Sequence, residues 1–262
     1  MQTLAAYTES FCIITPGGFL YRRVLYKYML GMCERNLMSL TEFIESNYST
    51  ACEMQRGIEK DNRMKNMLLR RNIDKELVKS WMRDYGLFQG IKAENRDAVV
   101  EKYAAVIFKI TDYKNTLDRE NIRIMFNALF SSLFNAVPRK WLSATSKLLW
   151  CSFPDQIVIY DAFVERALVV LQCIKPYLAR FPRIGISPDL KSEANIDNVV
   201  DFYMNYQDMV KAIFSEHKAQ LIQLRNKYSE EYPHDIRIID KLLWMVGSPN
   251  QSFSLDNVSC NA

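Results

Sequence analysis

The spacing of apolar side chains constrains this chain most, because that spacing is helical almost throughout. The clearest stretch lies between Asp118 and Pro138, where apolar residues follow one another in steps of three and four: Ile122, Met125, Phe126, Leu129, Phe130, Leu133 and Phe134. Such steps keep one face of an α-helix apolar over several turns. Asp118 is a suitable N-cap for this helix and Pro138 a suitable stop. The pattern predicts an all-α protein.

The same spacing predicts further helices along the chain. The additional apolar stripes run over residues 77–85, 99–110, 196–214 and 235–246. We expect Asp74 to cap the first of these helices, and Gly247 to close the last, with Pro249 beyond it. Only the β-branched run Gln156–Tyr160 is predicted to be extended.

Length and composition allow a large hydrophobic core. The chain has 262 residues, of which 49% are hydrophobic, so it can fold without further support. We predict an N-terminal helical region at 1–90, a helical core at 91–247 and a polar tail at 248–262. The N-terminal region is either separate or part of the same domain as the core, with a seam expected near residues 85–95.

Charge and cysteine usage narrow the expected surroundings of the protein. A formal net charge of +4 permits a nucleic acid as partner without requiring one. The six cysteines form no C-x-x-C pair, and His217 and His234 are the only histidines, so we expect no metal site and no cofactor. No apolar run reaches the ~18 residues of a membrane span. We therefore expect a cytoplasmic protein with reduced thiols and no membrane partner.

The segment from Pro138 to Leu171 carries the most chemistry. Its pattern predicts a short helix over 138–142, a tight turn at Ser143-Ala144-Thr145, and a second short helix beginning near Ser146. Lys147 would then lie in the first turn of that helix, where the helix dipole disfavours a cation. A lysine held toward its neutral amine is a nucleophile suited to Schiff-base chemistry. Lys147 is therefore a candidate catalytic residue.

Asp161 is the second candidate catalytic residue. It precedes a strongly apolar helix and fits the N-cap position, where backbone N–H groups hold a carboxylate ionised. Such a carboxylate can stabilise a cationic intermediate or move protons for Lys147. Spacing alone also allows a structural interpretation of both residues. Lysines early in short helices usually point to water, and aspartates are among the commonest helix starts.

The order of these motifs resembles the helix-hairpin-helix DNA glycosylases, in particular the 8-oxoguanine DNA glycosylase/lyase branch. The resemblance rests on the expected hairpin followed by Ser146-Lys147, by Cys151 four residues after the lysine, and by Ile159-Tyr160-Asp161. The closing motif RIIDKLLWMVG at 237–247 is similar to the end of bacterial proteins described as having an oxoguanine-glycosylase fold. Some of those proteins are encoded within antiphage defence systems.

This resemblance implies an activity and assigns roles. Lys147 would attack C1′ of a modified purine nucleotide, release the base and form an imine, from which strand cleavage follows by β-elimination. Asp161 would be its carboxylate partner, and Cys151 would lie against the flipped base. The implied setting is base excision repair or antiphage defence, with DNA as the expected partner.

Position near these motifs selects further candidate site residues. Trp150, Phe153 and Trp244 are candidates for stacking on an extruded base, although aromatic residues at helical spacing are more often core. The candidates for contacts with the nucleic-acid backbone are Arg139, Lys140, Ser143, Thr145 and Ser146. For the two basic residues the alternative is a solvated face.

Two alternatives to the enzyme remain open. Glycosylase hairpins usually read Gly-x-Gly, because glycines let backbone amides approach a phosphate, whereas this chain has Ser143-Ala144-Thr145. That difference favours a catalytically divergent module that binds a modified nucleobase or a protein partner of a defence system. The presence of Lys147 and Asp161 favours the enzyme. The other alternative is an unrelated helical interaction protein in which the motif is a coincidence.

Overall fold

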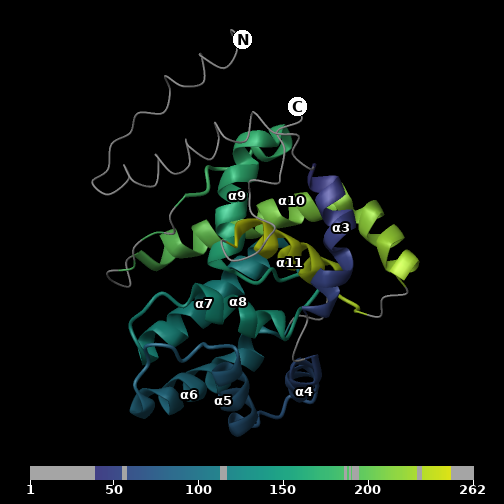
Figure 1. Cartoon of the computed structure of the whole chain (residues 1–262). Coiled ribbons are helices and arrows are strands. Elements are labelled where there is room, and N and C mark those ends of the chain that lie inside the picture. The colour runs from purple at the N-terminus through teal and green to yellow at the C-terminus, as the bar shows by residue number, and fades with distance from the viewer. Residues whose placement is uncertain are drawn as a thin grey trace.

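All the secondary structure in the described part of the chain is helical. The computed structural model describes residues 39–54, 58–112, 117–185, 188, 190, 195–228 and 232–248. No strand occurs in these ranges, so the predicted all-α class is confirmed (Figure 1). Residues 1–38 of the predicted N-terminal region, and the predicted tail after Ser248, lie outside the described residues.

The described helices form a bundle (Figure 1). In chain order they are α3 (Leu40–Glu53), α4 (Ile58–Leu69), α5 (Lys75–Asp84), α6 (Ala93–Ile110), α7 (Arg119–Ala136), α8 (Leu142–Trp150), α9 (Ala162–Ile174), the 3₁₀ helix η2 (Pro176–Leu178), α10 (Ile196–Tyr228) and α11 (Asp235–Gly247). Helices α4, α5 and α6 lie at one end, and α3, α9, α10 and α11 at the other. Between them, α7 packs on α6, α8 and α10.

Helix starts follow the predicted capping residues. The side chain of Asp118 accepts a hydrogen bond from the backbone N–H of Asn121 at 2.7 Å, and that of Asp74 accepts one from Leu77 at 2.9 Å. Each bond satisfies an N–H group that the first helical turn leaves without a partner. All seven apolar residues of the stripe predicted for α7 are buried. Capping and periodicity therefore position α5 and α7 as expected.

Gly247 differs from its prediction, because it does not close α11 in a left-handed turn. It is the last helical residue of α11, and the described glycines with positive φ are Gly86 and Gly90. Its lack of a side chain is instead required by packing. A Cβ atom at Gly247 would lie 1.8 Å from the carbonyl oxygen of Phe163 in α9. The glycine lets α11 and α9 approach closely beside Asp161.

Replacing Gly247 by alanine is expected to destabilise the protein. The added methyl group meets backbone atoms of α9, which cannot rotate away, so the loss should be at or above the ~1–3 kcal/mol usual for overpacking. Gly185→Ala is the matched control, since no heavy atom lies within 4 Å of a Cβ there. Urea unfolding of both variants measures the difference. An unchanged midpoint for Gly247→Ala would contradict this contact.

The β-branched run Gln156–Tyr160 is not helical and pairs with no strand. Side chains satisfy its backbone instead: Gln207 accepts from Val158 N at 3.1 Å, and the Tyr203 hydroxyl donates to Val158 O at 2.8 Å. The Tyr206 hydroxyl donates to the carbonyl oxygen of residue 159 at 2.9 Å. Buried backbone groups need such partners. Helix α10 therefore fixes the segment that leads to Asp161.

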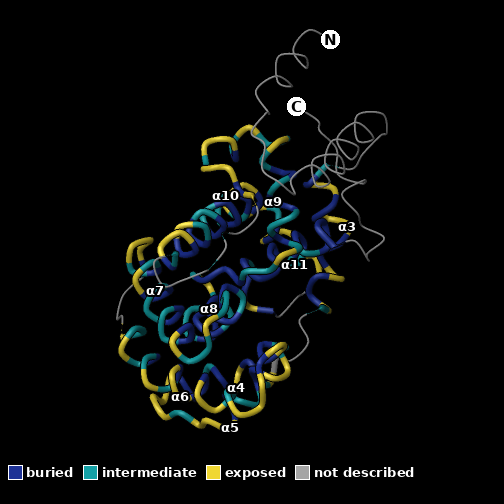
Figure 2. Tube along the Cα trace, turned by 90° about the vertical axis from the view of Figure 1, so that its left-hand side faces the viewer, coloured by how far each residue is buried: buried dark blue, intermediate teal, exposed yellow. Residues whose placement is uncertain are grey.

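The buried apolar side chains form one connected cluster that extends from Leu40 to Val246. The outward faces of α4, α5 and α6 are exposed, whereas α11 is buried along most of its length (Figure 2). The division of the chain near residue 90 stays a prediction. Among the described helices, none combines the length and hydropathy needed to cross a membrane.

Candidate functional site

Beyond its first residue, Asp235, helix α11 carries three charged residues where an apolar helix is expected. Ten of its thirteen residues are buried, yet it includes Arg237, Asp240 and Lys241. Arg237 is 9% exposed and Asp240 is 2% exposed. Charged residues are almost never buried this fully unless they are paired. Their presence in the centre of the bundle marks the candidate site.

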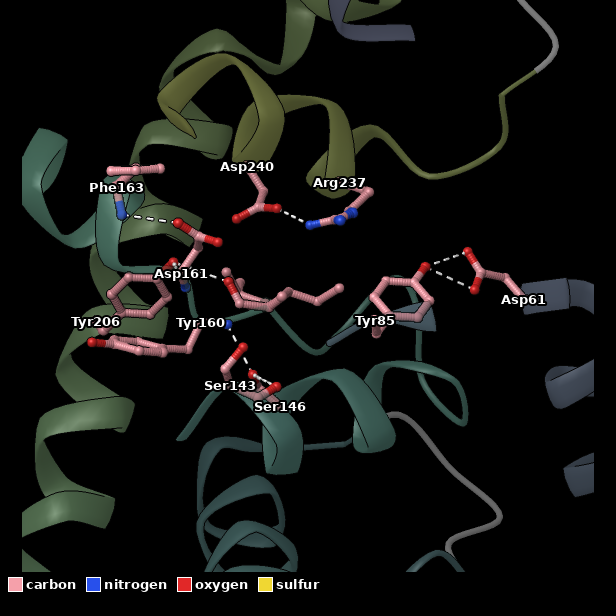
Figure 3. Close-up of polar contacts among 12 residues, drawn as sticks. Asp61, Tyr85, Ser143, Ser146, Tyr160, Asp161, Phe163, Tyr206, Arg237 and Asp240 are labelled. Carbon is pink, nitrogen blue, oxygen red and sulfur yellow. Dashed lines mark hydrogen bonds and ion pairs between the residues drawn. The ribbon is translucent and has the colours of Figure 1, made fainter. Parts of the chain in front are cut away.

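Arg237 and Asp240 form a buried ion pair one helical turn apart. The guanidinium donates to Oδ2 of Asp240, as Figure 3 shows. Burial raises the pKa of Asp240, although Arg237 opposes that rise. Burial would lower the pKa of Arg237, but Asp240 and nearby groups outweigh it and raise that pKa. The second carboxylate oxygen, Oδ1, is buried and has no hydrogen-bond partner among the described residues. The pair is therefore only partly satisfied.

Asp161 lies opposite Asp240 at the N-terminus of α9 (Figure 3). Its Oδ1 accepts a hydrogen bond from Phe163 N at 2.9 Å, which confirms the predicted N-cap. Its own backbone N–H donates to the Tyr206 hydroxyl at 3.3 Å. The bond from Phe163 orients the carboxylate, and the bond to Tyr206 holds the backbone at Asp161. Its negative charge acts on the pKa of both Lys147 and Lys241.

The predicted hairpin at Ser143-Ala144-Thr145 is wrong. These residues belong to α8, which is continuous from Leu142 to Trp150. The backbone N–H of Thr145 donates to Trp141 O at 2.8 Å, a bond that a tight turn at 143–145 would not make. The irregular stretch lies earlier, over residues 137–141, so the short helix predicted over 138–142 is also wrong: Pro138 follows the end of α7, and the next helix begins only at Leu142. Buried apolar residues on both sides of the short polar run keep it helical.

Lys147 consequently lies in the last turn of α8, not the first. The dipole there favours a cation, so the predicted reason for a neutral amine does not apply. The pKa of Lys147 is nevertheless lowered, because burial outweighs the attraction of Asp161. Its Nζ lies 5.5 Å from the centre of the Tyr85 ring. In the described part of the chain the ammonium makes no hydrogen bond and no ion pair.

A hydrogen bond between their preceding residues brings Lys147 and Asp161 together. Ser146 Oγ accepts from Tyr160 N at 2.9 Å and donates to Ser143 O at 3.2 Å (Figure 3). The Ser146 hydroxyl is fully buried and thereby fastens α8 to the segment that ends at Asp161. The site thus places the Lys147 amine, which has no hydrogen bond or ion pair among the described residues, near the Asp161 carboxylate.

The ring of Tyr85, whose hydroxyl is bound by the Asp61 carboxylate, contacts the amine of Lys147. The Tyr85 hydroxyl donates to Asp61, 2.8 Å from each oxygen, and Trp81 Nε1 donates to the same carboxylate at 2.8 Å. Burial, with the nearby Asp61 charge, raises the pKa of Tyr85, which keeps the phenol protonated. Tyr85 therefore presents a fixed ring face to Lys147. A cation over such a face is stabilised.

The predicted base-pocket residues divide into two pairs. Trp150 and Cys151 are each 2% exposed, so neither side chain lies on an open surface. Burial raises the pKa of the Cys151 thiol well above its ordinary value, and its charged neighbours are Asp61 and Lys65. Phe153 and Trp244 are half-buried, with Trp244 edge-on to Phe163 at 5.5 Å between ring centres. Only the second pair lies within reach of a ligand at the surface.

Of the predicted backbone contacts, Thr145 and Ser146 are fully buried and cannot touch a phosphate at the surface. Arg139 is half-buried, donates to Gln89 O at 2.6 Å and lies over the Trp141 ring. Lys140 and Ser143 are half-buried as well. The half-buried residues of the basic loop before α8 therefore remain candidates for contacts with the nucleic-acid backbone.

Asp155, His234 and Lys65 form a chain of hydrogen bonds beside Trp150. His234 Nδ1 lies 2.8 Å from Asp155 Oδ1, and its Nε2 lies 2.8 Å from Lys65 Nζ. The Lys65 ammonium in turn lies 4.6 Å from the centre of the Trp150 ring. Burial lowers the pKa of His234, despite the bond to Asp155. No spacing in the sequence indicates this contact, because its members come from distant segments.

Stability is expected to fall as the pH drops below about 6.5. Burial lowers the pKa of both His217 and His234, so the unfolded state binds more protons between the folded and unfolded pKa values. The contribution of the two histidines to the free energy of unfolding is complete above their pKa in the unfolded state. It is lost as the pH falls through their lower pKa in the folded state. Urea unfolding at several pH values measures it. The double variant His217→Gln, His234→Gln should flatten the dependence, and an unchanged slope would contradict the account.

The site contains no group of metal ligands in the described residues: no three His, Cys, Asp or Glu side chains gather there. Comparisons with known proteins found no match, whether to a family model, a curated protein or a solved structure. Function is therefore argued from the side chains of the site. Sequence reasoning missed Arg237, Asp240 and Tyr85. The opposite charges three residues apart in the apolar run of α11 were the available signal.

Proposed function

We propose that the protein is a DNA glycosylase with lyase activity that acts on an oxidised or otherwise modified purine through a Schiff base at Lys147. The observation that carries the proposal is the half-buried Lys147 amine, which has no hydrogen bond or ion pair among the described residues and lies near the Asp161 carboxylate. A nucleophilic lysine requires an environment that lowers its pKa, and burial provides one here.

The proposed reaction uses the amine, the carboxylate and the ring. Neutral Lys147 attacks C1′ as the glycosidic bond breaks, and the base leaves with the electron pair of that bond and takes a proton. The nitrogen loses a proton, the C1′–O4′ bond breaks as O4′ leaves with its electron pair and takes a proton, and an iminium ion joins Lys147 to C1′. Asp161 stabilises this cation by its charge, and the Tyr85 ring stabilises it by its face. Loss of the C2′ proton then forms a C2′–C3′ double bond and expels the 3′ phosphate, which cleaves the strand.

The proposed partner is DNA, held at the loop that enters α8. Arg139 and Lys140 lie in this loop, immediately before the helix that carries Lys147. Phosphate contacts by such residues would make binding weaken steeply with salt. We place the activity in the cytoplasm, in base excision repair or antiphage defence.

Trapping with borohydride tests the proposal. Duplex and single-stranded oligonucleotides with an abasic site or 8-oxoguanine are incubated with the protein and borohydride, which reduces the iminium to a stable secondary amine. We expect a covalent adduct with abasic DNA, and a weaker one from Asp161→Asn. A folded protein that forms no adduct on any of these substrates would overturn the proposal.

One observation favours a second candidate, a divergent module that binds a modified nucleobase or a defence-system protein. Trp150 and Cys151 are buried in this structure, so neither side chain presents an open face to a flipped base. For a nucleobase-binding module, the same oligonucleotides would bind without forming an adduct. For a module that binds a protein partner, neither binding nor an adduct would be seen.

A further inference from the structure

Asp61 on α4 is a buried carboxylate that takes no direct part in the proposed reaction. It is 6% exposed, and its side chain accepts hydrogen bonds from two aromatic residues, Trp81 and Tyr85. Charged groups are almost never buried this fully without partners that compensate for the loss of water. Because both donors are aromatic, the charge of Asp61 acts first on these two rings. Its effect on the site therefore depends on where the rings lie.

The side chain of Tyr85 is fixed by contacts at its hydroxyl, its ring and its backbone. Each oxygen of Asp61 lies 2.8 Å from the hydroxyl, and the ring packs against that of Trp81 with 4.3 Å between the ring centres. The backbone ends α5 in a turn in which Gly86 N donates to Arg83 O at 2.9 Å. Gly86 has a φ of 68°, which glycine adopts without strain. The ring is therefore preorganised and need not move when charge develops beside it.

The face of this fixed ring contacts Lys147. Lys147 Nζ lies 5.5 Å from the centre of the Tyr85 ring, within the ~6 Å over which a ring attracts a cation. A phenol that donates to a carboxylate is polarised, because the hydrogen bond draws its proton away and leaves more electron density on the oxygen and the ring. Figure 3 shows the two contacts between Asp61 and Tyr85. Through them, the Asp61 charge strengthens the attraction of the ring for a cation.

We propose that Asp61 is a positioning residue for the Schiff-base reaction, which acts through Tyr85 to stabilise positive charge at the Lys147 nitrogen. This inference rests on the proposed function. The nitrogen is neutral when it attacks C1′ and cationic in the iminium, and the polarised ring stabilises only the cationic form. Asp61 should therefore accelerate iminium formation. It also stabilises the ammonium of the resting protein, which carries its charge at the same nitrogen.

These two effects give the role a signature that a structural role does not have. Removing the polarisation should slow the reaction at high pH, where Lys147 is neutral in every variant. It should also lower the pKa of Lys147 further, because the ammonium loses stabilisation. A site that is merely loosened would admit water, and the pKa of Lys147 would then rise toward the roughly 10.4 of an ordinary lysine. The direction of the pKa change therefore separates the two roles.

Trapping rates on abasic DNA test the proposal in a double-mutant cycle. Tyr85→Phe keeps the ring and removes the hydroxyl, whereas Asp61→Asn keeps an acceptor oxygen and removes the charge. At the high-pH plateau, Tyr85→Phe should lower the rate of borohydride trapping by roughly 3- to 10-fold, a part of the roughly 30-fold that a whole desolvated contact between a cation and a ring contributes. Asp61→Asn should have a smaller effect. The double variant should match Tyr85→Phe, because Asp61 acts through the hydroxyl alone.

A labelling experiment tests the contact without any DNA. Each protein is treated with trace acetic anhydride at a series of pH values, and peptide mass spectrometry follows Lys147. Since only neutral amines react, the labelling midpoint should lie at lower pH in Tyr85→Phe and in Asp61→Asn than in the wild type. Tyr103→Phe is the matched control, because it removes another fully buried tyrosine hydroxyl, one with no hydrogen-bond partner among the described residues. Its midpoint and plateau rate should match the wild type.

The outcomes separate the role of Asp61 from the proposed function. If the wild type traps, the role of Asp61 is overturned by a Lys147 midpoint that stays or rises in both single variants. It is also overturned by a further loss from Asp61→Asn in the Tyr85→Phe background. In either case the lysine chemistry stands. If the wild type forms no adduct at any pH, the proposed function fails, and the role of Asp61 fails with it.

Discussion

Replacing Lys147 by methionine is expected to abolish the borohydride-trapped adduct with abasic DNA. Methionine has a similar length and shape but no amine, so no iminium can form. Because burial disfavours the Lys147 ammonium more strongly than the Asp161 charge favours it, the removal of this ammonium should not lower the free energy of unfolding. Burying an unpaired charge is itself unfavourable. The expected combination is therefore a complete loss of chemistry in a protein that is at least as stable.

Two measurements make this prediction specific. Urea unfolding of Lys147→Met shows whether the fold is intact. Lys211→Met shows the effect of losing another half-buried lysine, which lies on α10 and whose pKa burial also lowers. An adduct of wild-type yield from Lys147→Met would mean that another amine is the nucleophile. Lys241 would be the first to examine, because it is half-buried and lies on α11 directly after Asp240.

Replacing Asp240 by alanine is expected to have the largest effect on stability. The variant leaves the Arg237 guanidinium buried without its partner, since Arg237 donates to this carboxylate and is only 9% exposed. Breaking one side of a buried ion pair costs about 3–5 kcal/mol. Helix α11 packs on α9, α3 and α10, so Asp240→Ala should weaken helix packing at the centre of the bundle. Urea unfolding measures it.

Glu101→Ala is the matched control for this prediction. Glu101 forms an ion pair with Lys75 at 2.6 Å, but both side chains are more than half exposed. Exposed pairs contribute less than about 1 kcal/mol, so the control should be nearly neutral. Equal losses in the two variants would show that burial of the Arg237–Asp240 pair does not matter, and would contradict the description of the site.

Much of the fold follows from local rules that the sequence displays. The apolar stripe of α7 and the capping aspartates Asp118 and Asp74 depend only on residues three or four positions apart. The N-cap role of Asp161 is local in the same way. These features were predictable because the period of the helix and the geometry of its first turn are fixed.

The features that failed depend on contacts between distant segments. The polar run Ser143-Ala144-Thr145 favours a turn on propensity, but its neighbours Leu142 and Leu148 are buried, and packing keeps the run helical. The pKa of Lys147 was expected to fall for a local reason, the helix dipole. It falls because the bundle buries the side chain. Tertiary packing thus decided both outcomes.

The roles in the site were only partly visible in the sequence. Lys147 and Asp161 were singled out, and a hydrogen bond between the residues before them explains how they come together. Tyr85 and Asp61 could not be linked to them, because α4 and α5 lie far from α8 in the chain. The roles of Arg139 and Trp244 on a nucleic acid stay predictions.

The most direct test of the account is to locate the trapped linkage. Protein reduced with borohydride on an abasic oligonucleotide is digested with nuclease and protease, and the modified peptide is sequenced by mass spectrometry. The account predicts a reduced sugar remnant on the side-chain nitrogen of Lys147. A linkage on another amine, or no linkage from a folded protein, would contradict the assignment of Lys147 as the nucleophile.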